Sequence, residues 1–140
     1  MQIDPRGPRF AALVTTLVLI VVLITRSTWL LAAQAVVFAI GAGLGLRYAP
    51  YGLIYRSMIR PRLAPPQELE DEAPPRFAQA VGLLFAIIGV LGYATGATVL
   101  GIVAVAFALI AAFLNGAFGL CLGCELYLFI RRTLPARQAS

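Results

Sequence analysis

Long apolar runs separated by short polar breaks dominate this chain. Residues 10–25 are apolar apart from their threonines, residues 26–28 are polar, and an apolar run resumes over 29–46. Each run holds about 16 to 18 residues, near the minimum for a helix that crosses a hydrocarbon core of roughly 30 Å. The pattern therefore predicts a helical hairpin with a tight turn at 26–28.

A second apolar block covers residues 77–130. Its length of about 54 residues is enough for two spans and too long for one. Gly92 to Gly96 is the natural turn between them. A continuous helix over 97–130 would extend roughly 50 Å, so we expect the last span to end near Leu114, where Asn115 and several glycines offer a break. The sequence thus predicts four transmembrane helices arranged as two hairpins.

Composition and charge support this all-α integral membrane class. Hydrophobic residues make up 61% of the chain, charged residues only 12%, and mean hydropathy is +0.90. A soluble catalytic domain is excluded, because so little polar surface cannot cover the chain in water. Of the arginines, only Arg26 lies between the spans of a hairpin. The positive-inside rule then predicts a multi-pass plasma-membrane protein with both termini cytosolic, and the net charge of +5 reflects topology rather than a nucleic-acid partner.

The two halves of the chain resemble each other. Pro-Arg-Phe-Ala occurs at 8–11 and again at 75–78, and aromatic-Gly-Leu follows at 51–53 and 118–120 with the same offset. We expect one membrane domain over 1–140, made of repeat 1 (8–63), an acidic, Pro-rich cytosolic loop (64–74) and repeat 2 (75–135). Chance self-alignment of apolar sequence remains the alternative.

Each hairpin should be followed by a short helix. The first, over 51–60, mixes apolar residues with arginines and predicts an amphipathic segment on the membrane interface. The second, over 125–130, is almost wholly apolar and is expected to pack against the bundle. In the second span, Gln34 is a lone polar residue that predicts an interhelical hydrogen bond.

The only two cysteines form a Cys-Leu-Gly-Cys element at 121–124. Near a helix N-terminus, unpaired N–H groups and the helix dipole stabilise a thiolate, so Cys121 is the candidate nucleophile and Cys124 the resolving thiol. Glu125 is a tentative third catalytic residue, able to exchange protons with the thiols although its charge opposes thiolate formation. The alternative to a catalytic role is that the two small cysteine side chains only pack between helices. A metal site is disfavoured, because zinc needs four ligands and the chain has no histidine; no cofactor is predicted.

The opening Ile-Asp-Pro-Arg-Gly-Pro-Arg-Phe-Ala at 3–11, the four-span layout and Phe-Gly-Leu-Cys-Leu-Gly-Cys at 118–124 followed by Tyr127 resemble the bacterial membrane family called domain of unknown function 4395. Members are common in actinobacteria and are often encoded beside thioredoxin-like proteins and thiosulfate sulfurtransferases. The resemblance implies such proteins as partners, and it brings no activity because the family has none assigned.

Two hypotheses follow. In the first, cytosol-facing Cys121 and Cys124 cycle between dithiol and disulfide, or carry sulfane sulfur, in exchange with a soluble partner. In the second, the chain is a non-catalytic scaffold or complex subunit whose cysteines only pack. The lipid bilayer is the expected partner in both, and a homodimer stays open.

Overall fold

A computed structural model describes residues 2–3, 6–62, 70–71 and 73–133 of the chain. It is helical apart from two short strands. The elements in chain order are β1 (Gln2–Ile3), α1 (Arg6–Thr25), α2 (Thr28–Gly43), a 3-10 turn (Leu46–Tyr48), α3 (Pro50–Ile54), a π-helical turn (Tyr55–Ile59), a second 3-10 turn (Arg60–Arg62), β2 (Glu70–Asp71), α4 (Ala73–Ala94), α5 (Thr98–Phe118) and α6 (Leu122–Arg132).

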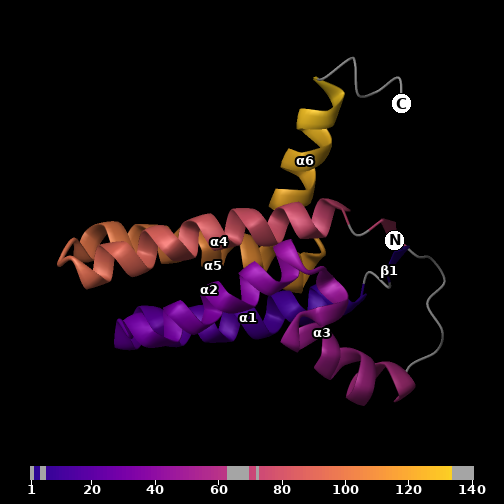
Figure 1. Cartoon of the computed structure of the whole chain (residues 1–140), viewed down its shortest axis with the longest axis horizontal. Coiled ribbons are helices and arrows are strands. Elements are labelled where there is room, and N and C mark those ends of the chain that lie inside the picture. The colour runs from indigo at the N-terminus through magenta and orange to yellow at the C-terminus, as the bar shows by residue number, and fades with distance from the viewer. Residues whose placement is uncertain (1, 4–5, 63–69, 72, 134–140) are drawn as a thin grey trace.

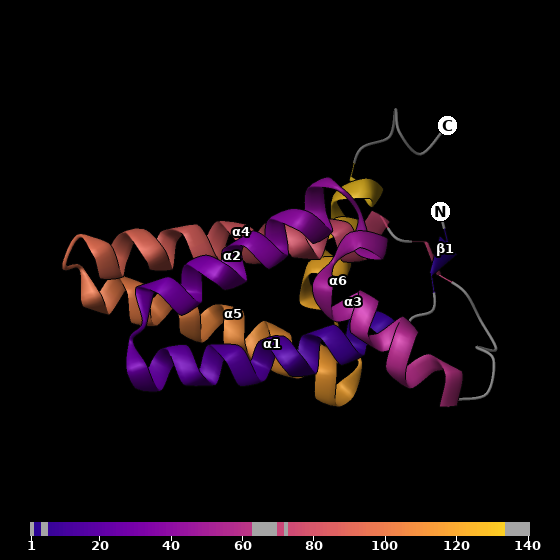
Figure 2. The same ribbon diagram turned by 60° about the horizontal axis from the view of Figure 1, so that its bottom comes forward.

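Four long helices form a bundle in which the two helices of the first hairpin pack mainly on the second hairpin. Helix α2 lies along α4, α1 lies along α5, and α4 pairs with α5. Figure 1 shows the two hairpin turns at one end of the bundle, while α1 and α4 begin at the other end, which we call the open end. Figure 2 shows α1 and α2 diverging from their turn, so each of them packs mainly on the opposite hairpin.

Three of these helices, α1, α4 and α5, are long and apolar enough to cross a membrane. Helix α2 is apolar but has only 16 residues, which corresponds to about 24 Å at 1.5 Å per residue. By length and composition, three of the four predicted spans are therefore helices that could cross a membrane.

The outward faces of the bundle are strongly apolar. Ile24 is 77% exposed, Trp29 87% and Val99 75%. The buried core is small by comparison and consists of Leu19, Val22, Leu31, Phe38, Ala86, Val105 and Ala108. Such a large exposed apolar surface is unfavourable in water and favourable in lipid, so the outward faces fit contact with a bilayer.

Both hairpin turns lie where the sequence predicts them. In the first, Arg26 has a positive φ of 55° and the Ser27 hydroxyl caps α2 by accepting from the Leu30 amide. In the second, α4 ends at Ala94 and Gly96 takes a φ of 86°.

The predicted end of the last span, near Leu114, is wrong. Helix α5 continues to Phe118 and ends at Gly119, whose φ of 72° is the left-handed conformation that closes helices. Gly116 does not break the helix, because it is buried against α1: a Cβ there would lie 2.8 Å from a Leu13 methyl carbon. Close packing with α1 therefore favours continued helix at this position.

The short segments differ in part from expectation. Helix α3 and the π-helical turn cover most of the predicted 51–60 helix. Only the start of α6 packs on the bundle, against α4, and the rest runs crosswise to α4 and away from it (Figure 1). Strands β1 and β2 pair antiparallel, with Ile3 opposite Glu70; this two-residue ladder was not predicted, and the fold class stays all-α. Most of the predicted loop at 64–74 lies outside the described residues.

Candidate functional site

The Cys-Leu-Gly-Cys element lies at the open end of the bundle, at the junction of α5 and α6. Cys121 is the N-cap residue of α6, as the sequence predicts for the nucleophile. Its Sγ accepts a hydrogen bond from the Cys124 amide at 3.2 Å. The two cysteines are joined by a disulfide, their Cα atoms 5.2 Å apart, and both side chains are half-buried.

Tight contacts with α4 fix the start of α6. A Cβ on Gly123 would lie 2.6 Å from both Cα and Cβ of Ala78, so only glycine permits this approach. One turn further, the Tyr127 ring contacts Phe77 with ring centroids 5.6 Å apart. These contacts, together with the turn at Gly119, position the cysteine pair beside α4.

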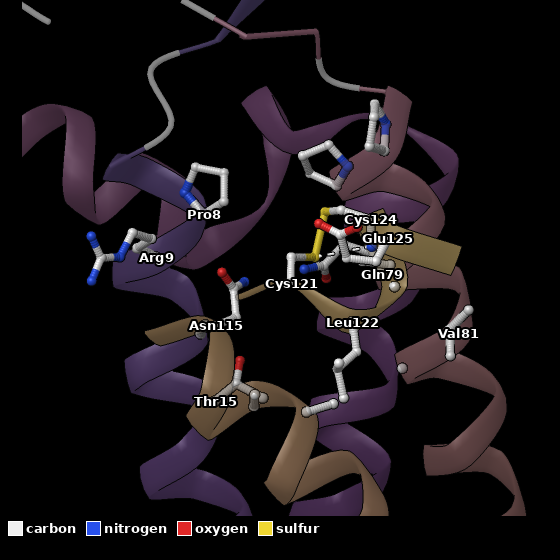
Figure 3. Close-up of a pocket in the computed structure, with 18 of the residues that line it drawn as sticks. Pro8, Arg9, Thr15, Gln79, Val81, Asn115, Cys121, Leu122, Cys124 and Glu125 are labelled. Carbon is white, nitrogen blue, oxygen red and sulfur yellow. Dashed lines mark hydrogen bonds between the residues drawn. A yellow bond between two sulfur atoms is a disulfide. The ribbon is translucent and has the colours of Figure 1, made fainter. Parts of the chain in front are cut away.

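Glu125 occupies the first turn of α6, and its side chain is exposed. A carboxylate in a first turn interacts favourably with the positive end of the helix dipole. Glu125 also lines the same cavity as both cysteines (Figure 3). The fold therefore brings the three predicted site residues together at one helix start.

A cavity of about 590 Å³ opens beside the disulfide, between α1, α4, α5 and α6. Its mouth is lined by Arg6 and by prolines of α1 and α4, and its inner end by Thr15 and Phe38. Between Pro8 and Thr15 helix α1 rises about 10 Å. The cavity therefore reaches from the open end into the middle of the spans.

Several polar residues lining this cavity were not predicted as site residues from the sequence. They come from three helices: Arg9 and Thr15 from α1, Gln79 from α4 and Asn115 from α5 (Figure 3). Arg9 donates to the carbonyl oxygens of Gly116 at 3.4 Å and Ala117 at 3.5 Å. A polar residue inside an apolar run is the only sequence signal for Asn115 and Gln79, and it does not reveal that they face one cavity.

Gln34, predicted to make an interhelical hydrogen bond, lies outside this cavity. Its Oε1 accepts from the Tyr51 hydroxyl of α3 at 2.7 Å, so the prediction is confirmed. Its Nε2 is buried and has no partner among the described residues. Burial raises the pKa of the Tyr51 hydroxyl, which keeps this group protonated as a donor.

The geometry defines a class: a small helical protein whose outward faces suit a bilayer, with a Cys-x-x-Cys disulfide at the rim of a cavity that enters the bundle. A family model described as "Domain of unknown function (DUF4395)" matches residues 3–132, and the chain belongs to this family. No curated protein and no solved structure matches the sequence.

Proposed function

We propose that Cys121 and Cys124 cycle between disulfide and dithiol in exchange with a soluble thiol partner on the cytosolic side of the plasma membrane. The main support for this proposal is that the Cys121 sulfur caps α6 by accepting a hydrogen bond from the Cys124 N–H. A thiolate at that position gains the same hydrogen bond and the favourable helix dipole. A reduced Cys121 is thereby activated for exchange.

Electrons and protons balance between the disulfide and a partner that carries two thiols. A partner thiolate attacks the disulfide and forms a mixed disulfide, which releases one thiolate of the pair. The partner's second thiolate then resolves the mixed disulfide, so the partner leaves oxidised and Cys121 and Cys124 leave as a dithiol. A thioredoxin-like protein is the proposed partner. A related route takes sulfane sulfur: Cys121 thiolate attacks the outer sulfur of thiosulfate, forming a persulfide and releasing sulfite.

In this proposal α2 is the fourth membrane span, and both termini lie in the cytosol. The arginine distribution supports this orientation, since Arg26 alone among the described arginines lies at the turn end. A bilayer accommodates the shorter α2 by local thinning at a modest free-energy cost.

We also propose that the hairpins are a duplicated unit, which equivalent contacts support. Arg9 of α1 reaches the end of α5, and Arg76 of α4 reaches the end of α2. Likewise, Phe10 contacts Tyr55 after the first hairpin, with centroids 5.9 Å apart, as Phe77 contacts Tyr127 after the second. Only the second unit carries cysteines, which makes the pair an addition to the scaffold.

Thiol trapping tests the exchange. In Cys124→Ser, attack by Cys121 on an oxidised thioredoxin-like protein should leave a stable mixed disulfide, whereas Cys121→Ser should trap little. A membrane-impermeant maleimide applied to each side of reduced membrane vesicles reports the orientation. Equal trapping by both variants, or labelling only from the periplasmic side, contradicts the proposal.

A structural role for the disulfide is the second candidate, favoured by the close packing of Gly123 on Ala78, where an added Cβ would lie 2.6 Å from the Ala78 Cα and Cβ. In that role the disulfide rigidifies the first turn of α6, which packs against α4, and the chain serves as a scaffold. The double variant Cys121→Ser/Cys124→Ser separates the two. Lost thermal stability with no change in the redox state of soluble thiol proteins, or in growth on thiosulfate, supports the scaffold.

A further inference from the structure

The inner part of the cavity has a lining suited to an aromatic ring. Phe38 and Phe85 line it with aromatic carbon, while Ala108, Ala111 and Ala112 keep it open by their small size. The whole cavity, mouth included, has a volume of about 590 Å³, which falls within the usual range for small-molecule sites. Aromatic side chains in such a wall favour offset or edge contacts with another ring.

Three uncharged polar side chains line this cavity, in addition to the charged residues near its mouth. Thr15, Gln79 and Asn115 come from α1, α4 and α5. In the part of the chain that the structure describes, none of them makes a side-chain hydrogen bond, whereas the neighbouring Thr16 hydroxyl donates to the Ala12 carbonyl at 2.7 Å. Thr15 is only 5% exposed. Gln79 and Asn115 are half-buried, so the three side chains present hydrogen-bonding groups that a ligand with acceptor oxygens can use.

The cysteine pair at the rim of the cavity indicates which reaction the ligand takes part in. If the partner reduces the disulfide in each cycle, another group must remove two electrons and two protons from Cys121 and Cys124. The cavity reaches into the spans between Pro8 and Thr15, so a lipid-soluble acceptor can enter it. The acceptor needs a flat ring for the aromatic wall and carbonyl oxygens for the amide and hydroxyl donors.

We infer that this cavity binds the ring of an isoprenoid quinone, which reoxidises the Cys121–Cys124 dithiol; the inference rests on the proposed redox cycling. Two thiols and one quinone yield one disulfide and one quinol, so the two S–H bonds supply both electrons and both protons. Asn115 and Gln79 donate to the quinone oxygens, and this polarises the ring toward reduction. An acyl chain of a phospholipid has the right polarity for the walls but no acceptor for these donors.

Binding is tested with the full chain in lipid nanodiscs, using decylubiquinone and a short-chain naphthoquinone as probes. The Cys121→Ser/Cys124→Ser variant should bind saturably, because binding does not require the thiols. Ala111→Phe fills the cavity and Asn115→Leu removes a donor at similar size; each should weaken binding at least tenfold. Ala80→Phe, the same change as at 111 but on an exposed face of α4, should bind normally.

Turnover is tested with reduced protein freed of excess reductant. Quinone addition should restore the disulfide and form one quinol per chain, and Ala111→Phe should slow this at least tenfold. Equal, non-saturable uptake by all variants overturns the inference, and so does binding without disulfide formation. Trapping of the mixed disulfide at Cys121 needs no quinone. If the mixed disulfide still forms but quinone does not bind, only the assignment of the cavity is wrong. If the mixed disulfide does not form, the proposed function itself is wrong.

Discussion

The Arg76 guanidinium of α4 caps the end of α2 through the Ala42 carbonyl: its Nη2 and Nε donate to that oxygen at 2.8 and 3.2 Å, and Nη2 also donates to the Gly43 oxygen at 3.0 Å. Carbonyls at a helix C-terminus have no partner within the helix, and a cation there also interacts favourably with the dipole. A side chain from one hairpin thereby completes a helix of the other.

Replacing this cation should destabilise the bundle. Arg76→Gln loses charge-assisted hydrogen bonds and should lower the free energy of unfolding by about 1–2 kcal/mol. Arg9→Gln is the matched comparison and should cost less, because the Arg9 contacts are longer, at 3.4 and 3.5 Å. Thermal unfolding in detergent, followed by far-UV circular dichroism, measures both. An equal or reversed order contradicts the capping argument.

The approach of Gly123 to Ala78 predicts a specific steric effect. Gly123→Ala forces α6 away from α4 and should cost about 1–3 kcal/mol. Gly43→Ala is the control, because a Cβ there has no neighbour within 4 Å. The displaced helix should also expose the cysteines, so their disulfide should be reduced faster by a water-soluble phosphine in Gly123→Ala. Unchanged stability and reduction rate would rule out this packing.

The hydrogen bond from Tyr51 to Gln34 predicts both a mutational and a pH effect. Tyr51→Phe leaves the Gln34 oxygen without its donor and should cost about 1–3 kcal/mol. Tyr93→Phe is the contrasting control, since the Tyr93 hydroxyl is buried without a partner among the described residues; removing it should be neutral or stabilising.

Burial raises the pKa of Tyr51 above its ordinary value of 10.0. The folded state therefore holds this proton more tightly than the unfolded state. The contribution of Tyr51 to stability is fully present below pH 10.0 and is lost as the pH rises through the higher folded-state value. The difference in tyrosinate absorbance between the wild type and Tyr51→Phe, followed against pH, measures this titration. A midpoint at or below the ordinary pKa contradicts the predicted upward shift.

The charge of Glu125 should restrain the reactivity of the reduced cysteines. Glu125→Gln removes a negative charge at the same helix start, so alkylation of Cys121 by iodoacetamide in the Cys124→Ser background should accelerate about two- to fivefold. Because the Glu125 side chain is exposed, added salt should shrink the difference. An unchanged rate at low salt would show that the carboxylate does not interact with the thiolate.

Much of this local structure follows from the chain itself. The turns at Arg26 and Gly96 are predictable because polar and glycine residues interrupt runs of spanning length. Cys121 is predictable as a helix start because glycines precede an apolar helical segment. The end of α5 was misplaced, since the sequence offers several glycines and only the contact of Gly116 with Leu13 decides which of them lies within the helix.

The sequence by itself determines the membrane class, the hairpins and the family, because run length, charge placement and motif spacing are local properties. Tertiary structure alone decides that α1 packs on α5 and α2 on α4, since side-chain fit between distant segments selects among similar apolar faces. The same packing places Thr15, Gln79 and Asn115 around one cavity beside Cys121. These residues lie far apart in the chain, and only the close approach of three helices makes them neighbours.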